Sequence, residues 1–389
     1  MKFPKFTHHI CLVSEQTLPN YLGTVMPDAS PQTVHLVVTD RMKERANILE
    51  KALRERGMAV EHYPLASPRP NEMLAVLNAI REKTPSGSLA VNVTGGTKVM
   101  ALAAVEWAGI QDEHPFLFYV DTDSKKILQI GGKMDEFEMT VKLKVKELLK
   151  AGAGASLREK TGESLNKAKI DLLDRLLRSF LKHNSALKLF NDCAQKAKVR
   201  QYPYADMPSS CPQGFMEALD MAREAGKLSI ASEKIIDYQS EENRSWCNGG
   251  WLEHFVKALL YRMQSDGIID DWGSNVKIPN EQKSLGKALS PNDKNELDAA
   301  FTVANRLFLI ECKTADLARN NAFPDVIYKL DSLKKSLGGV LSRGMIVSVL
   351  EPRHADIQRC EELGIKLVYG TDVLKLEDKL KNWIENVHR

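Results

Sequence analysis

Short apolar segments alternate with helix-forming segments through the first 130 residues, and this alternation limits the possible folds more than any other feature. The apolar segments are HHICLVS, VHLVVTD, MAVEHYP, SLAVNVT and FLFYVDT. Between two of them, RMKERANILEKALRERG spaces Ala46, Leu49 and Leu53 three and four residues apart, as in an amphipathic helix. Strands joined by helices form parallel sheets with helices on both faces. The pattern therefore predicts a doubly wound α/β domain.

The chain has 389 residues, which is too long for one ordinary core, so two or three domains are expected. Small residues near positions 150 to 156 indicate one boundary, and much of the sequence that follows has helical spacing. We predict an N-terminal domain over residues 1–145, a mainly helical connector over residues 146–240 and a C-terminal α/β domain over residues 241–389. The connector fits a winged-helix-like module and equally a plain spacer bundle.

Composition narrows the class of protein without identifying a function. The apolar fraction of 43% and the charged fraction of 27% are typical of a globular protein. No apolar run approaches the length that spans a bilayer, and the N-terminus lacks a signal-peptide pattern, so a cytoplasmic protein without membrane contact is expected. The six scattered cysteines are expected to be reduced core residues. A net charge of +3 neither establishes nor excludes a nucleic-acid partner.

The segments ELDAAFTV and RLFLIECKT are predicted to form a β-hairpin that brings acidic and basic residues together. Alternate residues of a strand share a face, so Glu311 and Lys313 share one. A two-residue turn at Asn305 and Arg306 would set the register. Asp298 would then pair with Lys313 and lie diagonally next to Glu311. A register shift of one residue would turn Asp298 to the opposite face.

Two carboxylates in one half-buried site repel each other, and a bound cation would keep both ionised. Oxygen ligands favour Mg²⁺ or Mn²⁺, which activate bound water for attack on a phosphodiester. Lys313 would orient that water or stabilise negative charge. The predicted metal ligands are Asp298, Glu311 and Glu253, the last on a preceding helix. The alternatives are an exposed ion pair between Glu311 and Lys313 and a solvated Glu253.

The segment VTGGTK lies between an apolar strand and an Ala-rich helix. Amides at a helix N-terminus bind anions, and glycines let a phosphate approach the backbone. The segment therefore predicts a phosphate-binding turn formed by Thr94, Gly95, Gly96, Thr97 and Lys98. Neither GxxxxGK[ST] nor GxGxxG is present, which disfavours an NTPase or a dinucleotide enzyme. A turn that serves only the packing of the helix is the alternative.

The other strand ends of this domain reach the same edge of the sheet, where ligands of doubly wound sheets bind. They offer Ser14, Gln16 and Asn20 after the first strand, and Thr39 and Asp40 after the second. These groups suit ribose hydroxyls and base edges, although each also fits a turn or a helix cap.

The C-terminal pattern resembles the PD-(D/E)xK nuclease superfamily, in which an Asp on one strand precedes a Glu-x-Lys on the next, behind a helix that carries a Glu. Asp298, Glu311, Lys313 and Glu253 match these roles in order, and Leu297 replaces the Pro of the motif. With LVSEQTLPN and VTGGTK, the chain resembles a CRISPR-associated Rossmann fold (CARF) domain joined to such a nuclease. The expected fold is thus α/β, with a Rossmann-like CARF domain, a helical connector and a restriction-endonuclease-like domain.

Such proteins are ancillary effectors of type III CRISPR systems. The resemblance implies a homodimer whose CARF domains bind one cyclic tetra-adenylate across the two-fold axis. Binding would activate a metal-dependent nuclease that cuts DNA, RNA or both in antiviral defence. The alternative function is a ligand-sensing, nucleic-acid-binding regulator without catalytic activity, in which the C-terminal hairpin is structural.

Overall fold

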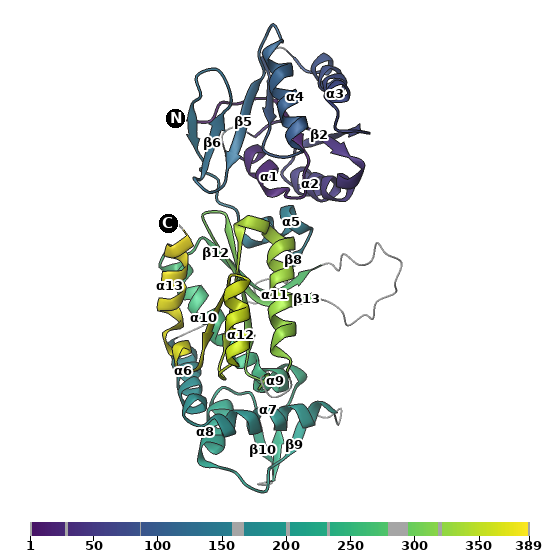
Figure 1. Ribbon diagram of the computed structural model, residues 1–389. Helices are drawn as coiled ribbons and strands as arrows, with labels where there is room; N and C mark the ends of the chain where they lie inside the picture. The colour runs from purple at the N-terminus through teal and green to yellow at the C-terminus, as the bar shows by residue number, and fades with distance from the viewer. Residues whose placement is uncertain are drawn as a thin grey trace.

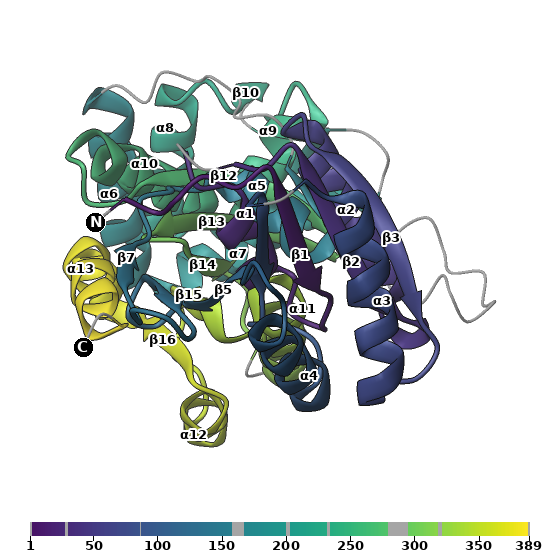
Figure 2. The ribbon, with the colours of Figure 1, turned by 90° about the horizontal axis from the view of Figure 1, so that it is seen from above.

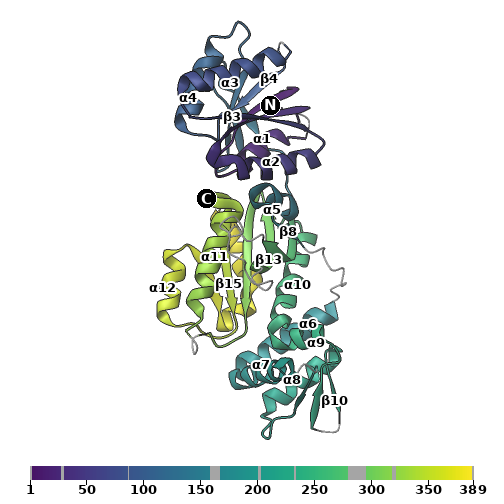
Figure 3. The same ribbon diagram turned by 90° about the vertical axis from the view of Figure 1, so that its right-hand side faces the viewer.

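The computed structural model has three parts along its long axis (Figures 1 and 3). A sheet of the N-terminal residues lies at one end, a second sheet of the C-terminal residues lies in the middle, and a small helical module lies at the other end. The structure describes residues 2–27, 30–85, 87–157, 167–199, 203–231, 234–278, 295–317 and 321–387.

The N-terminal sheet has the strand order β3-β2-β1-β4-β5-β6-β7. The first five strands are parallel, and the last two form an antiparallel extension. Their bounds are β1 His8–Leu12, β2 Thr33–Thr39, β3 Ala59–Leu65, β4 Leu89–Asn92, β5 Phe116–Asp121, β6 Lys126–Gln129 and β7 Glu136–Glu138. The predicted doubly wound fold is confirmed for this part of the chain.

Helices cover both faces of this sheet (Figure 2). Residues of α1 (Leu18–Thr24) and α2 (Lys43–Glu55) share a core with Cys11 and Leu36 on one face. Residues of α3 (Pro70–Lys83) and α4 (Lys98–Gly109) share a second core with Ile10 and Leu12 on the other. Because successive residues of β1 alternate between the two cores, the strand is apolar from Ile10 to Leu12.

The middle module contains α6 (Lys167–Lys182), α7 (Asn184–Val199) and α8 (Gln213–Glu224). Beside them lies an antiparallel sheet of three short strands, which are β9 (Tyr204–Asp206), β10 (Ser229–Ala231) and β11 (Ile235–Asp237). The prediction of a mainly helical region is confirmed, and the small sheet is an addition to it. The predicted domain boundaries stay a prediction.

The C-terminal sheet has the order β16-β15-β14-β13-β12-β8. Its strands are β8 Ser156–Leu157, β12 Asp271–Ile278, β13 Asn295–Val303, β14 Arg306–Lys313, β15 Ser342–Ser348 and β16 Ile365–Tyr369. The connector was predicted to begin at residue 146, yet its β8 completes this sheet by pairing with β12. Strands β12 to β14 are antiparallel, whereas β14 to β16 are parallel.

Helices also cover both faces of the C-terminal sheet. After a short helix α9 (Glu241–Ser245) and a kinked turn over Trp246–Gly250, α10 (Trp251–Ser265) packs with Phe301 and Phe308. On the opposite face, α11 (Phe323–Gly338) packs with Leu307 and Leu309. The outer helices are α12 (His354–Glu362) and α13 (Leu376–Val387).

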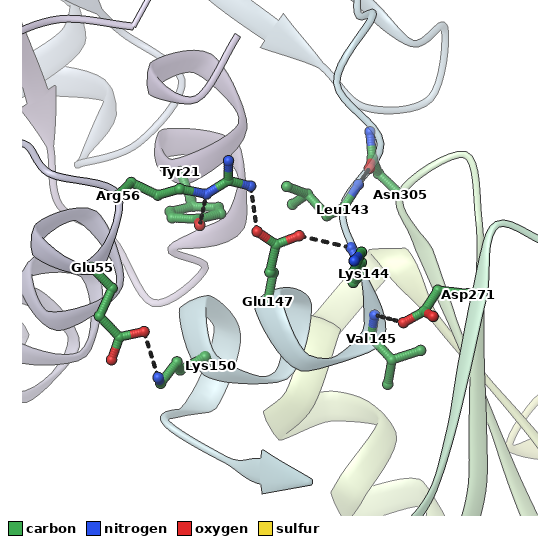
Figure 4. Close-up of polar contacts among 10 residues, drawn as sticks. All are labelled: Tyr21, Glu55, Arg56, Leu143, Lys144, Val145, Glu147, Lys150, Asp271 and Asn305. Carbon is green, nitrogen blue, oxygen red and sulfur yellow. Dashed lines mark hydrogen bonds and ion pairs between the residues drawn. The ribbon is translucent and has the colours of Figure 1, made fainter. Parts of the chain in front are cut away.

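Helix α5 (Val145–Ala153) joins the two sheets and is fixed to both by polar contacts (Figure 4). On the N-terminal side, Glu147 pairs with Arg56 and Lys150 pairs with Glu55 of α2. On the C-terminal side, the amide of Val145 donates to Asp271, 2.9 Å away on β12. The helix is therefore a rigid link rather than a loose tether.

Two further expectations can be compared with the structure. All six cysteines are free thiols, and five of them are buried, as expected for reduced core residues. No helix in the described part of the chain is long and apolar enough to cross a bilayer.

Candidate active site

The hairpin formed by β13 and β14 has a different register from the predicted one. Thr302 pairs with Leu307, and the last pair of the ladder is Ala299 with Ile310. This register places Asp298 across from Glu311, so the predicted pairing of Asp298 with Lys313 is wrong. The residue opposite each position differs from the predicted one by two, and a shift of two keeps every side chain on its face. Asp298 and Glu311 therefore remain on the same face, as predicted.

The turn explains the shift. Its central residues are Ala304 and Asn305, with φ angles of 49° and 63°, whereas the prediction placed them at Asn305 and Arg306. A two-residue hairpin turn of this kind needs positive φ at both positions. The Asn305 side chain fixes the turn. It accepts from the amide of Leu143 over 2.8 Å (Figure 4) and donates to the carbonyl of Val141 over 2.8 Å.

Asp298 lies just beyond the last ladder pair, where β13 and β14 separate. Its carboxylate accepts the backbone amide of Cys312 over 2.6 Å, in place of a ladder hydrogen bond. Burial, together with the negative charges of Glu311 and Glu253, raises the pKa of Asp298 to about 8. Three carboxylates thus act on one another in a poorly hydrated site.

Glu311 is almost fully buried at the end of β14 and has two ammonium partners on one oxygen. Its Oε1 lies 2.7 Å from Nζ of Lys313 and 3.3 Å from Nζ of Lys329 on α11. Its buried Oε2 has no hydrogen-bond partner. Burial lowers the pKa of Lys313, but the charges of Glu311 and Asp298 outweigh burial and leave that pKa above its ordinary value.

Glu253 lies in the first turn of α10, directly after the kink at Trp246–Gly250. Lys257, on the same helix, lies 3.7 Å from its carboxylate. Its charge reaches Asp298, but no three acidic, His or Cys side chains of the described residues are grouped closely enough to hold a metal ion. Ligation by Glu253 therefore stays a prediction.

Asp298 and Glu311 nevertheless fit a divalent cation. The mutual repulsion that raises the pKa of Asp298 would be relieved by a cation, and Oε2 of Glu311 lacks the partner that a buried carboxylate oxygen requires. Both ligands are oxygen atoms, which suits Mg²⁺ or Mn²⁺.

At the N-terminal sheet, the glycine turn lies against the loop after β1. A Cβ on Gly95 would collide with the carbonyl oxygen of Leu12 and lie 3.2 Å from Oγ of Ser14 and 3.1 Å from Nδ2 of Asn20. Gly95 therefore allows the two strand ends to approach each other. The structure brings Ser14, Asn20 and the glycine turn together, as predicted from the shared sheet edge.

Several of these polar groups also serve the fold. Asn20 donates to the carbonyl of Leu12 over 2.8 Å, while its buried Oδ1 has no partner. Thr94 donates to Asn92 over 2.6 Å and accepts the amide of Val120 over 2.7 Å. Thr97 caps α4 by accepting the amide of Met100 over 3.2 Å. These hydrogen bonds show that Asn20, Thr94 and Thr97 stabilise the turn and cap the helix, which is the alternative role considered for such residues.

Of the remaining predicted ligand residues, Gly96 and Lys98 belong to the turn itself, and Thr39, Asp40 and Gln16 lie on other segments. Lys98 is exposed at the first position of α4, and Gly96 has a φ of 71°. Asp40 is exposed and pairs with Lys43 over 2.9 Å, next to Thr39 at the end of β2. Gln16 reaches the end of α11 in the C-terminal part of the chain, because a Cβ on Gly339 would lie 2.7 Å from its Nε2.

Two family models match the chain. The Card1 CARF domain matches residues 8–148, and the endonuclease domain of Card1-like proteins matches residues 240–387. The chain belongs to the Card1-like CARF nucleases. Residues 149–239 of this family member lie between the two matched domains. No curated protein matches the chain in sequence.

Solved structures share the fold of this CARF nuclease over nearly its whole length. Protein VC1899 from Vibrio cholerae is 22% identical, with a TM-score of 0.82 and coverage of 98% of both chains. Can2 from Sulfobacillus thermosulfidooxidans, solved in complex with cyclic tetra-adenylate, is 26% identical, with a TM-score of 0.76 and coverage of 97% of this chain and 99% of Can2. A type III CRISPR defence DNA nuclease activated by cyclic oligoadenylate has a TM-score of 0.55 at 19% identity, and the match covers 95% of this chain and 48% of that nuclease.

Sequence reasoning missed Lys329 of this nuclease. The helical segment VIYKLDSLKKSL contains three lysines, and spacing alone does not indicate which of them faces β14. It also missed the contact of Gln16 with Gly339. The φ of Gly339 is positive, at 53°, which gives that glycine a conformational role. A contact between the loop after β1 and the end of α11 leaves no local pattern in the sequence.

Proposed function

We propose that this chain is a metal-dependent nuclease that cyclic tetra-adenylate activates through its CARF domain, in type III CRISPR antiviral defence. The observation that carries the proposal is the position of Asp298 opposite Glu311, with Lys313 beside them, at the separated ends of β13 and β14. A structural ion pair would not require a second, partly buried carboxylate opposite Glu311. This pairing of carboxylates disfavours the alternative of a regulator with an inert hairpin.

Asp298 and Glu311 would hold the metal, and Glu253 would contribute from α10. A bound divalent ion supplies charge stabilisation and lowers the pKa of water. Lys313, whose ammonium group lies 2.7 Å from Glu311, would orient the attacking water or stabilise charge on the phosphate. The buried position of Glu311 excludes bulk water from the same centre.

The ligand would bind at the glycine turn and the loop after β1. Can2 binds cyclic tetra-adenylate, and this chain shares its fold at 26% identity. The unpartnered Oδ1 of Asn20 and the exposed Lys98 suit the base edges and phosphates of such a ring.

A homodimer would place two ligand sites face to face. The apolar side chains of Val99, Leu102, Val105 and Ile110 are exposed on and just after α4. The same helix begins at the glycine turn. Two copies that meet through α4 would therefore bring both turns to one two-fold axis, where a symmetric ring can contact each copy equally.

Two contacts would transmit a conformational change from the ligand site to the C-terminal sheet. Gln16 lies on Gly339, which follows α11, and α5 is bound to α2 on one side and to Asp271 on the other (Figure 4). A ligand that favours one arrangement of the loop after β1 would shift α11 and α5 together, and activation requires tighter binding to the active arrangement.

The test is an incubation of purified protein with plasmid DNA and labelled RNA, in Mn²⁺ or EDTA, with and without cyclic tetra-adenylate. Cleavage that requires Mn²⁺ and increases with the ligand is the expected result. Absence of cleavage under all conditions, with ligand binding measured separately, would favour the regulator.

A further inference from the structure

One face of α7, in the middle module, lies across two segments that lead to the candidate metal ligands. Asn191 on α7 donates through Nδ2 to the carbonyl oxygen and to Oγ1 of Thr314, each 3.3 Å away. Thr314 directly follows Lys313, the last residue of β14. The middle module therefore contacts the strand that carries Glu311 at the point where this strand leaves the sheet.

The same helix also contacts the kinked turn from which α10 begins. Asn248 of this turn donates to Oε1 of Gln195 over 3.2 Å, and Gln195 is four residues from Asn191, on the same face of α7. Arg244 of α9, which is buried, donates to the backbone carbonyl of Ala194 over 3.0 Å. Helices α7 and α9 lie together at one end of the C-terminal sheet (Figure 1).

Thr314 joins the two segments. Gly249 of the kinked turn has a φ of 108°, and a Cβ on it would lie 2.5 Å from Oγ1 of Thr314. The turn can approach the loop after β14 this closely because Gly249 has no side chain. The hydroxyl of Thr314 is therefore held between Asn191 and the turn that leads directly to Glu253 in the first turn of α10.

Asn191 lowers the stability of the fold in one respect. Its Oδ1 is buried and has no hydrogen-bond partner among the described residues. Burial of an unpaired amide oxygen is unfavourable, and a residue that only filled space at this position would be apolar. The contact of its Nδ2 with Thr314 gives a reason for an amide here.

We propose that the middle module positions the metal ligands, with Asn191 as a positioning residue that acts through Thr314. The distance between the start of α10 and the end of β14 determines whether Glu253 can reach an ion held by Asp298 and Glu311. Helix α7 fixes this distance from outside the C-terminal sheet, because it contacts both segments. The inference rests on the proposed nuclease function and gives the middle module a role in it.

The test measures three properties of the full chain: Mn²⁺ affinity by electron paramagnetic resonance without nucleic acid, cleavage kinetics, and the melting temperature in EDTA. Asn191→Ala is expected to weaken Mn²⁺ binding about 10- to 100-fold, the range for residues that orient metal ligands. It should lower kcat with little change in KM, because it alters the geometry of the centre rather than the binding of the substrate.

Two variants of Thr314 test the same contact with a smaller change. Thr314→Val removes the hydroxyl with little change in shape and should weaken Mn²⁺ binding, whereas Thr314→Ser keeps the hydroxyl and should bind like wild type. Combining Asn191→Ala with Thr314→Val should weaken binding less than the two separate effects predict, because both variants remove one contact. The matched control is Asn184→Ala, at an exposed position at the start of α7, which should match wild type.

The inference is overturned if Asn191→Ala and Thr314→Val keep the wild-type affinity for Mn²⁺, whether or not their melting temperatures fall, since a merely structural contact gives that result. It is also overturned if Thr314→Ser loses as much affinity as Thr314→Val. Both results would leave the proposed nuclease function standing. A wild-type chain that binds no Mn²⁺ and cleaves no nucleic acid would contradict the inference and the proposed function together.

Discussion

Polar groups are treated in opposite ways at the ends of β13 and β14, here called the nuclease end, and at the glycine turn, here called the sensor end. At the ends of β13 and β14, charges are buried with too few partners, since the pKa of Asp298 is raised to about 8 and Oε2 of Glu311 has no partner. At the glycine turn, uncharged groups such as Thr94 and Thr97 are hydrogen-bonded to their own fold. The nuclease end therefore needs a cation, whereas the sensor end is already formed before its ligand binds.

Glu311→Gln tests the nuclease end and should have the largest effect. Loss of the charge removes a metal ligand and a partner of Lys313, so cleavage should fall by on the order of 10³-fold or more. Binding of cyclic tetra-adenylate, measured by calorimetry, should not change. Glu385→Gln on the exposed face of α13 is the control. Full activity of Glu311→Gln would contradict the assignment.

Gly95→Ala tests the preformed sensor end. The added Cβ would collide with the carbonyl of Leu12 and separate the turn from the loop after β1, so ligand affinity should fall about 100-fold, or about 2.7 kcal/mol. Gly109→Ala is the matched control in the same helix–turn unit, because a Cβ there has open space around it. Equal ligand affinities of the two variants would show that the close approach is unimportant for binding.

Lys98→Ala should have a smaller effect on the same end, because it removes one exposed charge and leaves the turn intact. Loss of one charge-assisted contact to a phosphate corresponds to about a tenfold decrease in ligand affinity. Calorimetry at two salt concentrations checks this, with Lys51→Ala, at an exposed position of α2, as the control. A variant whose affinity matches wild type at low salt would remove Lys98 from the ligand site.

Asp298→Asn tests whether the charge on Asp298 destabilises the metal-free protein. Its effect, on the melting temperature, should be the smallest of the four. The folded pKa of Asp298, about 8, lies above its unfolded value near 4. The folded state therefore holds the extra proton between these values, and the free energy of unfolding falls as pH rises from about 4 to about 8. In EDTA at pH 8 the variant should melt about 2 to 5 °C higher than wild type, with no difference at pH 4. If the variant melted at a lower temperature than wild type at pH 8, the unfavourable charge on Asp298 would be contradicted. Addition of Mn²⁺ should raise the melting temperature of wild type only.

Two kinds of feature could be predicted from the sequence: which residues of a strand share a face, and which residues lie at the strand ends. The parity of Asp298 and Glu311 was correct, because a two-residue turn that moves by one residue shifts the register by two and leaves both side chains on the same face. The turn was misplaced by one residue because its anchor is Leu143, more than 160 residues away. Arg306 supplied an available signal against the predicted turn, since long side chains seldom adopt positive φ.

Contacts between distant segments could not be predicted. Lys329 approaches Glu311 only because α11 packs across β14, and its sequence spacing resembles that of Lys334 and Lys335, which pair with Asp331 instead. The glycine turn was located correctly, but the collision at Gly95 depends on how close β1 and β4 lie.

The measurement that tests the central claim most directly is a titration of the full chain with Mn²⁺, followed by electron paramagnetic resonance without any nucleic acid. The account predicts a Mn²⁺ site that Glu311→Gln loses and Glu385→Gln keeps, with affinity that rises as pH increases through about 8 because Asp298 must lose its proton. A wild-type chain that binds no Mn²⁺, or binding that Glu311→Gln leaves intact, would contradict the account.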